Sequence, residues 1–508
     1  MSFDFQLFEE LNRNSGKPKI SEELITNIYK YHTKGGFNNI FISQILNILS
    51  IFFRSLFILF VFIMIDWSNI LLCGNNIKDF SDGDDAFFCG HFSDYLNFSS
   101  LKEPNFFIIN ILCLAIGLII YGIFQSINLI KDFKIFRNVQ KFYIEELYIF
   151  DTQLFSITWN DIATTIAKNN DITVENISHI IMRKENYFIG LINNDIINFH
   201  NEKYFNRQLE YNIYNIIFEN SKFNFYNTPS EKIKKRFMIV GFINLILSPF
   251  ILIYIIISFI FSNIDELYIN RNILGPRRYT RLALWKFREY NELPHFFQRR
   301  INKSINYANE YIKQFPAPLY EIFAKFIGLI SGAFIFLLLV LSLLDESILL
   351  YVSAFNRSLI FYAGIFTTIS AFCRTYITEP GKNIYEPKKI MNKLEEHLHN
   401  IPSHWKNKGN AIEVKNEFLR NFCYRIELFF YDILGVIITP YLLLFELPRC
   451  SNNIRDFLTK NTIYIQNVGN ICSLSNFNKE EKDKKMELSI SSFNNNYNKS
   501  LWFEEYES

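Results

Sequence analysis

The chain has 508 residues, 49% of them hydrophobic, and a mean hydropathy of +0.07. This composition excludes an ordinary water-soluble protein. The 52 basic and 50 acidic residues leave a net charge of +2, which gives no overall positive field for nucleic acid, so we expect no nucleic-acid partner.

Six long apolar runs predict an α-helical integral membrane protein with a large soluble part. Each run has 18 to 25 residues, and a helix needs roughly 20 apolar residues to cross a bilayer. The runs are Ile45–Ile65, Phe106–Ile130, Phe237–Phe261, Phe326–Leu344, Ile348–Phe372 and Leu428–Phe445. The first run begins too late and is too long for a cleavable signal peptide, so we interpret it as a retained span.

A cytosolic N-terminal arm (1–40) is predicted to precede a transmembrane hairpin (41–130). The hairpin loop, residues 67–105, has two lysines against six acidic residues and is predicted to be lumenal. It contains Cys73 and Cys89, and the sequon at Asn97, so a disulfide and glycosylation there would suit an oxidising lumen. Two cysteines in a short loop also arise by chance. Further sequons show how readily an Asn-rich chain forms this motif; they begin at Asn176, Asn302, Asn356 and Asn498.

Positive charge decides between six and four crossings. If all six runs crossed from a cytosolic N-terminus, residues 263–325 and 373–424, with 11 and 9 Lys/Arg, would face the lumen, against the positive-inside tendency. Runs three and six contain Pro249 and Pro440 near their middles, and a proline can break a membrane helix into a hairpin. We therefore predict four transmembrane and two re-entrant helices per protomer, with both termini cytosolic. A Pro-kinked true span is the alternative.

The predicted order after the first hairpin alternates between soluble and membrane segments. It comprises a cytosolic domain (131–236), a re-entrant helix (237–262), a cytosolic segment (263–325), a second transmembrane hairpin (326–374), a cytosolic segment (375–424), a second re-entrant helix (425–448) and a cytosolic C-terminal segment and tail (449–508).

The cytosolic domain is predicted to be mostly helical. Apolar spacing indicates a helix over Ile149–Ala167, and Met182–Ile192 puts a polar turn before an apolar run, as in a hairpin. From Ser473 onward the chain is rich in Asn, Lys, Ser and Glu, which predicts a mostly disordered tail.

The segment Trp285–His295 gathers polar side chains at close spacing. They are Arg288, Glu289, Asn291, Glu292, Pro294 and His295. On a helix, Arg288 and Glu292 would pair as i, i+4, and we interpret the segment as a structural hinge with Pro294 fixing the turn, rather than as a catalytic site. We expect no metal site downstream, because His397 and His399 lack the i, i+4 spacing of two helical ligands.

Trp285–His295, with Arg299–Asn302 after it, strongly resembles the signature of the autophagy-related protein nine family. Further matching motifs occur in family order between about Gly35 and Phe493. They are Arg183–Tyr187, Arg236–Met238, Ser248–Phe250, Leu344–Glu346, Cys373–Arg374, His397–His399 with Pro402 and His404–Trp405, Thr439–Pro440, Ile454–Phe457 and Gly469–Ser473. The arm before the first span and the tail after Cys472 are short, so regulatory and adaptor sites of longer members are not assumed.

The resemblance implies a homotrimer with four transmembrane and two re-entrant helices in each protomer. It implies residence on Golgi- and endosome-derived vesicles and on the preautophagosomal, or isolation, membrane. The implied activity is energy-independent phospholipid scrambling, which equilibrates the leaflets during autophagosome expansion with lipid delivered by a bridge-like transfer protein. No covalent chemistry, enzyme activity or cofactor is expected.

A scramblase of this kind needs polar residues along a hydrated path, because burying a lipid head group is costly. The candidates within or beside the apolar runs are Asn110, Gln125, Asn128, Asn244, Ser248, Asn356, Arg357, Thr367, Thr368, Ser370, Asp432 and Thr439. Arg357 is predicted either to contact lipid phosphate, or to snorkel or pair with an acid such as Asp432. Mid-helix Ser and Thr more often bond their own backbone.

Two alternatives of other classes stay open. Broken helices also suit a secondary transporter or channel, and basic stretches such as Lys232–Arg236 suit a membrane scaffold that recruits autophagy factors, an anionic lipid contact or a topology anchor. ATP-driven pumping and hydrolase chemistry lack motif support; Gly381-Lys382, for instance, lacks the rest of a phosphate-binding loop.

Overall fold

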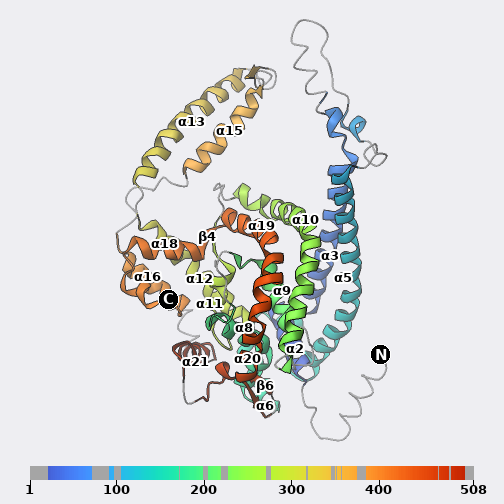
Figure 1. Cartoon of the computed structure of the whole chain (residues 1–508), viewed down its shortest axis with the longest axis vertical. Coiled ribbons are helices and arrows are strands. Elements are labelled where there is room, and N and C mark those ends of the chain that lie inside the picture. The colour runs from blue at the N-terminus through green and yellow to red at the C-terminus, as the bar shows by residue number, and fades with distance from the viewer. Residues whose placement is uncertain are drawn as a thin grey trace. The chain divides into compact units, whose positions relative to one another are not determined.

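The computed structural model is predominantly helical (Figure 1). It describes residues 21–70, 72, 91–96, 105–170, 172–197, 204–218, 227–269, 276–315, 318–344, 349, 352–355, 357–374, 385–466, 468–479 and 482–497. Cys73, Cys89, Asn97 and Asn356 lie outside these residues. The chain forms two compact units, residues 1–181 and 182–508, which are described separately.

The first unit is built around a pair of long helices, α3 and α5. Its helical elements are α2 (Glu22–Thr33), α3 (Phe37–Leu59) with a π-helical turn η1 (Phe60–Met64), the 3₁₀ turn η2 (Phe92–Tyr95), α5 (Phe106–Glu145), the 3₁₀ turn η4 (Asp151–Gln153), α6 (Trp159–Asn170) and α7 (Val174–Ile181). The buried Ser55 hydroxyl on α3 donates to the Ala115 carbonyl on α5 at 3.0 Å. Gly122 faces the Phe52 ring so closely that an added Cβ would lie 2.9 Å from it. The small residue therefore permits the close packing of α3 and α5.

The second unit contains the remaining membrane-length helices and three short strand pairs. Its helices are α8 (Arg183–Asn193), α9 (Arg207–Phe218), α10 (Ser230–Ile269), α11 (Arg281–Phe287), α12 (Pro294–Lys313), α13 (Pro318–Leu344), α15 (Leu359–Arg374), α16 (Pro387–Leu398), α17 (Ser403–Asn407), α18 (Ile412–Asn421), α19 (Arg425–Tyr441), the π turn η7 (Leu442–Glu446), the 3₁₀ turn η8 (Leu447–Cys450), α20 (Ser451–Lys460), the 3₁₀ turn η9 (Ser473–Ser475) and α21 (Lys484–Tyr497). Its antiparallel pairs are β1 (Arg277–Tyr279) with β4 (Phe422–Tyr424), β2 (Ser353–Ala354) with β3 (Arg357–Ser358), and β5 (Thr462–Ile465) with β6 (Gly469–Cys472).

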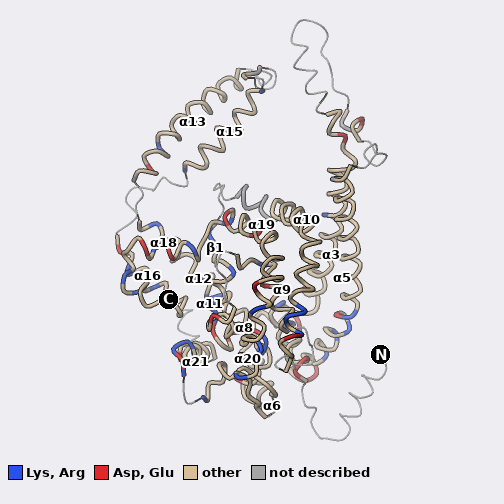
Figure 2. Tube along the Cα trace, in the orientation of Figure 1, with Lys and Arg blue, Asp and Glu red and all other residues tan. Residues whose placement is uncertain are grey.

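Five helical segments within the described residues are long and apolar enough to cross a membrane. They are Phe37–Met64, Ile108–Glu145, Ser230–Phe261, Leu319–Leu344 and Arg425–Lys460. Figure 2 shows that α13 and α15 carry charges mainly near their ends. Apolar side chains on these helices are open to the surroundings; Leu343 on α13, for example, is 79% exposed. Such faces suit hydrocarbon, not water.

The fifth apolar run differs from the prediction. The apolar helix described in this part of the chain is Leu359–Arg374, which is shorter than the other candidates, and β2 and β3 form a strand pair just before it. Arg357 thus precedes α15 instead of lying within a membrane helix. Phe355, between the two strands, has a left-handed φ of 48°, which fits a tight chain reversal.

The two proline-containing helices pack against each other. The Phe259 ring on α10 stacks on Phe429 of α19 at 3.8 Å. Gly241 on α10 lies against Leu443 and Leu444 of the π turn η7. In Figure 1, α10 changes direction along its length, and Pro249 within it removes one helical hydrogen bond, which is a common cause of a bend.

Two soluble predictions are wrong. Met182–Ile192 does not form a hairpin, because nearly all of it belongs to the helix α8. The residues of α8 from Asn186 to Ile192 are all buried, so the sequence shows no helical alternation of apolar and polar residues there. The predicted disordered tail is ordered over the described residues 473–479 and 482–497, because Met486 and Ser489 on α21 are buried against the rest of the unit. The expected helix over Ile149–Ala167 is divided between η4 and α6.

Candidate functional site

The signature segment forms a non-helical turn between α11 and α12. Pro294 is the first residue of α12, where a missing N–H costs no helical bond, and the His295 ring packs on Phe296 at 3.9 Å. Asn291 adopts a left-handed φ of 56°. Its backbone N–H donates to Asn186 Oδ1 at 2.9 Å, and its Oδ1 accepts from Asn186 Nδ2 at 2.8 Å. The amide pair therefore fixes the turn to α8.

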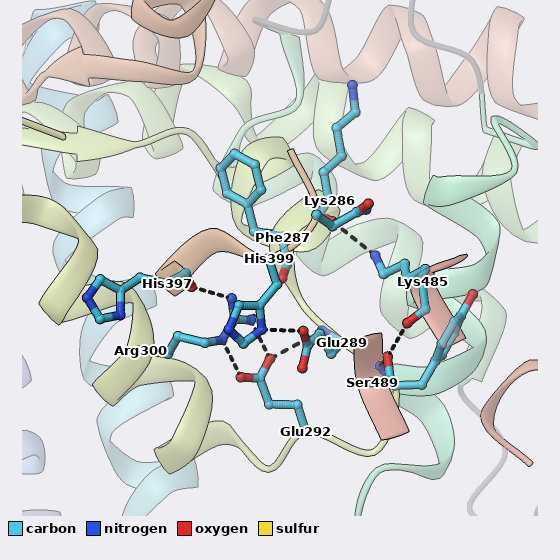
Figure 3. A network of polar contacts seen from close by, with 11 residues as sticks. Lys286, Phe287, Glu289, Glu292, Arg300, His397, His399, Lys485 and Ser489 are labelled. Carbon is cyan, nitrogen blue, oxygen red and sulfur yellow. Dashed lines mark hydrogen bonds and ion pairs between the residues drawn. The ribbon is translucent and has the colours of Figure 1, made fainter. Parts of the chain in front are cut away.

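A buried ion pair closes the same turn (Figure 3). Arg300 Nε donates to Glu292 Oε1 and Arg300 Nη2 to Oε2, both at 2.7 Å. Arg300 also donates to the carbonyls of His397 at 2.7 Å and Phe287 at 2.9 Å. The predicted pairing of Arg288 with Glu292 is wrong, because residues 288–293 are not helical and the Glu292 carboxylate faces α12 instead. Arg288 lies over the Trp285 ring at 5.2 Å.

A second carboxylate of the signature meets a histidine. Glu289 is 1% exposed, and its Oε1 is 2.6 Å from His399 Nδ1. Burial favours the neutral carboxyl, but the His399 hydrogen bond and the Arg300 charge outweigh it and hold the pKa of Glu289 below its ordinary value. His399 is the first residue after α16, and its own backbone adopts a left-handed φ of 58°.

The other two histidines of this region have partners of their own. The His397 ring stacks on Tyr307 at 5.2 Å, and His404 Nε2 is 2.7 Å from Glu417 Oε2. Hydrogen bonding and packing therefore account for how these rings lie.

Helix α21 completes the network from the far end of the sequence. Lys485 Nζ donates to the Lys286 carbonyl at 3.0 Å, and the Tyr290 N–H donates to Ser489 Oγ at 3.1 Å. Burial lowers the pKa of Lys485 to about 7. Glu289, Glu292, Ser492 and Tyr497 are among the residues that line a shallow crevice between α21 and the signature turn. Lys485 and Ser489 were not predicted from the sequence, because the polar composition of this segment gives no sign that these two side chains are buried.

Two of the predicted lipid-path residues are buried in amide contacts. Asn244 on α10, 7% exposed, accepts from Gln208 Nε2 at 2.7 Å and Asn212 Nδ2 at 3.3 Å. Thr439 on α19 accepts from Asn206 Nδ2 at 3.5 Å. All three donors belong to α9 or immediately precede it, in the predicted cytosolic domain. In the sequence, these donors could have been suspected only from the i, i+4 spacing of Gln208 and Asn212, which places two amides on one face of a helix.

Several other candidates bond within their own helices. Asn110, Ser248, Thr367 and Thr368 donate to carbonyls three or four residues earlier, and Gln125 donates to the Tyr121 hydroxyl one turn away. Asn128 and Ser370 are half-buried on α5 and α15. Arg357 is exposed, with its guanidinium 5.5 Å from the Phe361 ring centre.

Asp432 is the candidate with the most charged surroundings. It lies on α19, half-buried, where the charges of Arg281 and Arg207 act on its carboxylate. Arg281 Nε is also 3.8 Å from Glu210 Oε2. Positive and negative groups therefore meet at the face of an apolar helix.

Comparisons with known proteins agree with the signature. A family model described as Autophagy protein ATG9 matches residues 22–478. Autophagy-related protein 9 of Dictyostelium discoideum is 30% identical, with 91% of this chain and 67% of that protein covered. The protein of the same name from Eremothecium gossypii is 29% identical, with 90% of this chain and 53% of that protein covered. This chain therefore spans about half to two thirds of the length of these relatives.

A solved structure has a similar fold. The cryo-EM structure of Schizosaccharomyces pombe Atg9 matches with a TM-score of 0.62 and 28% identity, covering 89% of this chain and 98% of that one. The resemblance read from the signature segment is thereby confirmed. The chain belongs to the Autophagy protein ATG9 family.

Proposed function

We propose that this chain is an energy-independent phospholipid scramblase that equilibrates lipids between leaflets while the autophagosome membrane expands. The observation that carries the proposal is Asp432, a half-buried carboxylate on an apolar helix, on which the charges of Arg281 and Arg207 act. A zwitterionic head group carries both signs of charge, so a site that also carries both can replace part of its water. Family membership supplies the autophagic setting.

The mechanism requires no bond to break. A lipid whose head group contacts Asp432, Arg207 and Arg281 keeps its tails in hydrocarbon, so the barrier falls for both directions of transfer. Because the barrier is lowered equally both ways, the leaflets equilibrate without nucleotide. We therefore propose a passive transporter and not an enzyme, in which these side chains bind and release phospholipid.

The membrane arrangement belongs to the same proposal. Four transmembrane and two re-entrant helices, α10 and the segment from α19 to α20, keep the basic segments and both termini in the cytosol, supported by the charge distribution and the prolines within α10 and α19. A homotrimer on Golgi- and endosome-derived vesicles would cover part of the exposed apolar helix faces. A bridge-like lipid-transfer protein is the proposed source of lipid.

Lipid exchange in liposomes tests the proposal. The purified chain is reconstituted without nucleotide, and dithionite quenching of a fluorescent lipid reports access to the inner leaflet. We expect quenching beyond half of the label, slowed by about tenfold or more in Asp432→Leu, since replacing a charge-assisted contact costs about 1.4 kcal/mol or more. Glu413→Gln, an exposed acid on α18, is the matched control and should exchange lipid at the parent rate.

Two outcomes would favour the alternatives. Ion current without lipid exchange would indicate a channel or secondary transporter, for which the prolines within α10 and α19 are the supporting feature. A folded parent protein that moves neither lipid nor ions would indicate a scaffold.

A further inference from the structure

Helix α21 lies on the signature turn with a face that is largely polar. Its buried side chains Lys485, Ser489 and Ser492 are spaced i, i+4 and i+7, so they share one side of the helix. Glu487 and Asn494 are exposed on the opposite side. A helix is held mainly by the apolar surface that it buries, and a docked face of this composition buries little. The face of α21 is therefore that of a helix that can leave its site.

The contacts of α21 are distributed along its length. At its beginning, Lys485 Nζ donates to the Lys286 carbonyl at 3.0 Å (Figure 3). In its middle, Ser489 Oγ accepts a backbone N–H of the signature turn at 3.1 Å. At its end, the Tyr497 ring lies 5.8 Å from Phe296 on α12. Loss of the Lys485 contact would leave the first turn of α21 without its bond to α11.

Lys485 is buried without a carboxylate partner. It is 9% exposed, and within the described residues no carboxylate forms a salt bridge with it. Glu292 is engaged by Arg300 at 2.7 Å. Glu289 is engaged by His399 at 2.6 Å. An ammonium has three N–H donors, and a buried charge that is not paired is costly. The site therefore accommodates the neutral amine better than the ammonium.

Several charged and titratable groups lie around Lys485. They are Glu289, Tyr290 and Glu292 in the signature turn, Lys286 on α11, Arg300 on α12, His399 after α16, and Asp483, Lys484 and Glu487 in or beside α21. Burial has the largest effect and lowers the pKa of Lys485 to about 7; Glu289 and Glu292 oppose this shift, and Arg300 adds to it. Because a lysine in water keeps its proton at this pH, protonation and docking of α21 are linked.

We propose that α21 is a pH-sensitive strap over the signature turn, which stays docked while Lys485 is neutral and is released when Lys485 takes up a proton. Release moves the ammonium into water and opens the crevice that Glu289 lines. The pairs of Glu289 with His399 and of Glu292 with Arg300 remain, because neither involves α21. The inference goes beyond the proposed function and does not depend on lipid exchange.

Thiol labelling of the full chain in detergent tests the release. Single-cysteine proteins, in which the seven native cysteines are replaced, carry Ser492→Cys on the docked face of α21 or Asn494→Cys on its exposed face. The ratio of the labelling rate at 492 to that at 494 cancels the pH dependence of the thiol itself. We expect this ratio to rise by up to about tenfold per unit as the pH falls from 9 to 7, and to level off below about pH 7.

Variants at two neighbouring lysines identify the group that controls the strap. Lys485→Met should keep the ratio low and constant over this range. Lys484→Met, which removes an exposed charge, should follow the parent. A ratio in the parent that does not change with pH would overturn the proposal, as would equal curves for the parent and Lys485→Met. If Ser492→Cys does not fold, hydrogen exchange of the α21 amides, corrected for the intrinsic rate, decides by the same criterion.

A buried native thiol separates local release from loosening of the whole unit. A protein that retains only Cys423, buried on β4, should stay protected from labelling at every pH of the series. Labelling of Cys423 that rises together with that of residue 492 would show that the unit opens as a whole and would contradict a strap.

Discussion

Arg300 binds three separate parts of the second unit. Its guanidinium holds the Glu292 carboxylate, the last turn of α11 through Phe287 and the end of α16 through His397. Its planar fork matches these acceptors in a way that an ammonium cannot. Arg300 is therefore a positioning residue for the signature turn.

We predict that Arg300→Lys lowers the free energy of unfolding by on the order of 2 kcal/mol, because charge is kept while several hydrogen bonds are lost. The midpoint of thermal unfolding in detergent measures the change. Arg455→Lys, at an exposed arginine on α20, is the control and should leave the midpoint nearly unchanged. Equal midpoints for the two variants would show that the fork is dispensable.

Lys485 gives the signature region a dependence on pH. Its pKa of about 7 in the folded chain lies below its ordinary value of 10.5, and Glu289, Glu292 and Arg300 are the charged groups that act on it. Between these pKa values the unfolded chain binds more protons than the folded one. This group's contribution to stability is therefore smallest below about pH 7 and rises with pH, by up to about 1.4 kcal/mol per unit.

We expect Lys485→Met to flatten this dependence and to raise the unfolding midpoint most at pH 6, since the aliphatic stem stays and the buried charge goes. Unfolding curves from pH 6 to pH 9 measure it. Lys484→Met removes an exposed charge next to it and should follow the parent curve. Parallel curves for the parent and Lys485→Met would refute the assignment.

At the scale of elements, the Asn206 side chain connects the beginning of α9 to α19. Asn206 Oδ1 accepts from the Leu209 N–H at 2.7 Å, which caps the first turn of α9. Its Nδ2 lies against Gly435, where an added Cβ would meet it at 1.5 Å. Because Gly435 has no side chain, the capped end of α9 can pack directly on α19.

Gly435→Ala should displace Asn206 and destabilise the chain by about 2–4 kcal/mol, the sum of a lost cap and an overpacked contact. The unfolding midpoint again reports it. Gly332→Ala on α13, where an added Cβ meets nothing within 4 Å, is the matched control. A Gly435→Ala protein as stable as Gly332→Ala would mean that α9 shifts freely.

Elements were predictable where hydrophobicity alone decides them. Five of the six apolar runs lie in helices of membrane length, because a long apolar run has no other favourable environment. The beginning of the fifth run was not predictable, since β2 and β3 depend on a local reversal at Phe355. Helix α21 and the contacts of Asn206 were missed because they depend on distant partners, which a local pattern does not contain.

At the scale of the whole molecule, the path of the chain through the membrane can be tested by labelling. Asp94→Cys, Asn302→Cys and Lys408→Cys are introduced singly into a chain whose seven native cysteines are replaced. In sealed vesicles with the cytosolic face outward, four crossings predict that a membrane-impermeant maleimide labels residues 302 and 408, and residue 94 only after detergent. Protection of 302 and 408 would instead support six crossings.

The order of synthesis gives the signature turn a further consequence. Its partners arrive late: Glu289 meets His399 across 110 residues, and Tyr290 meets Ser489 across 199. A ribosome that has just completed the turn leaves Glu289 without its histidine and the Tyr290 N–H without its serine. The segment can therefore be fully buried only after the residues up to Ser489 have been translated, so its burial reports that both distant partners have been made.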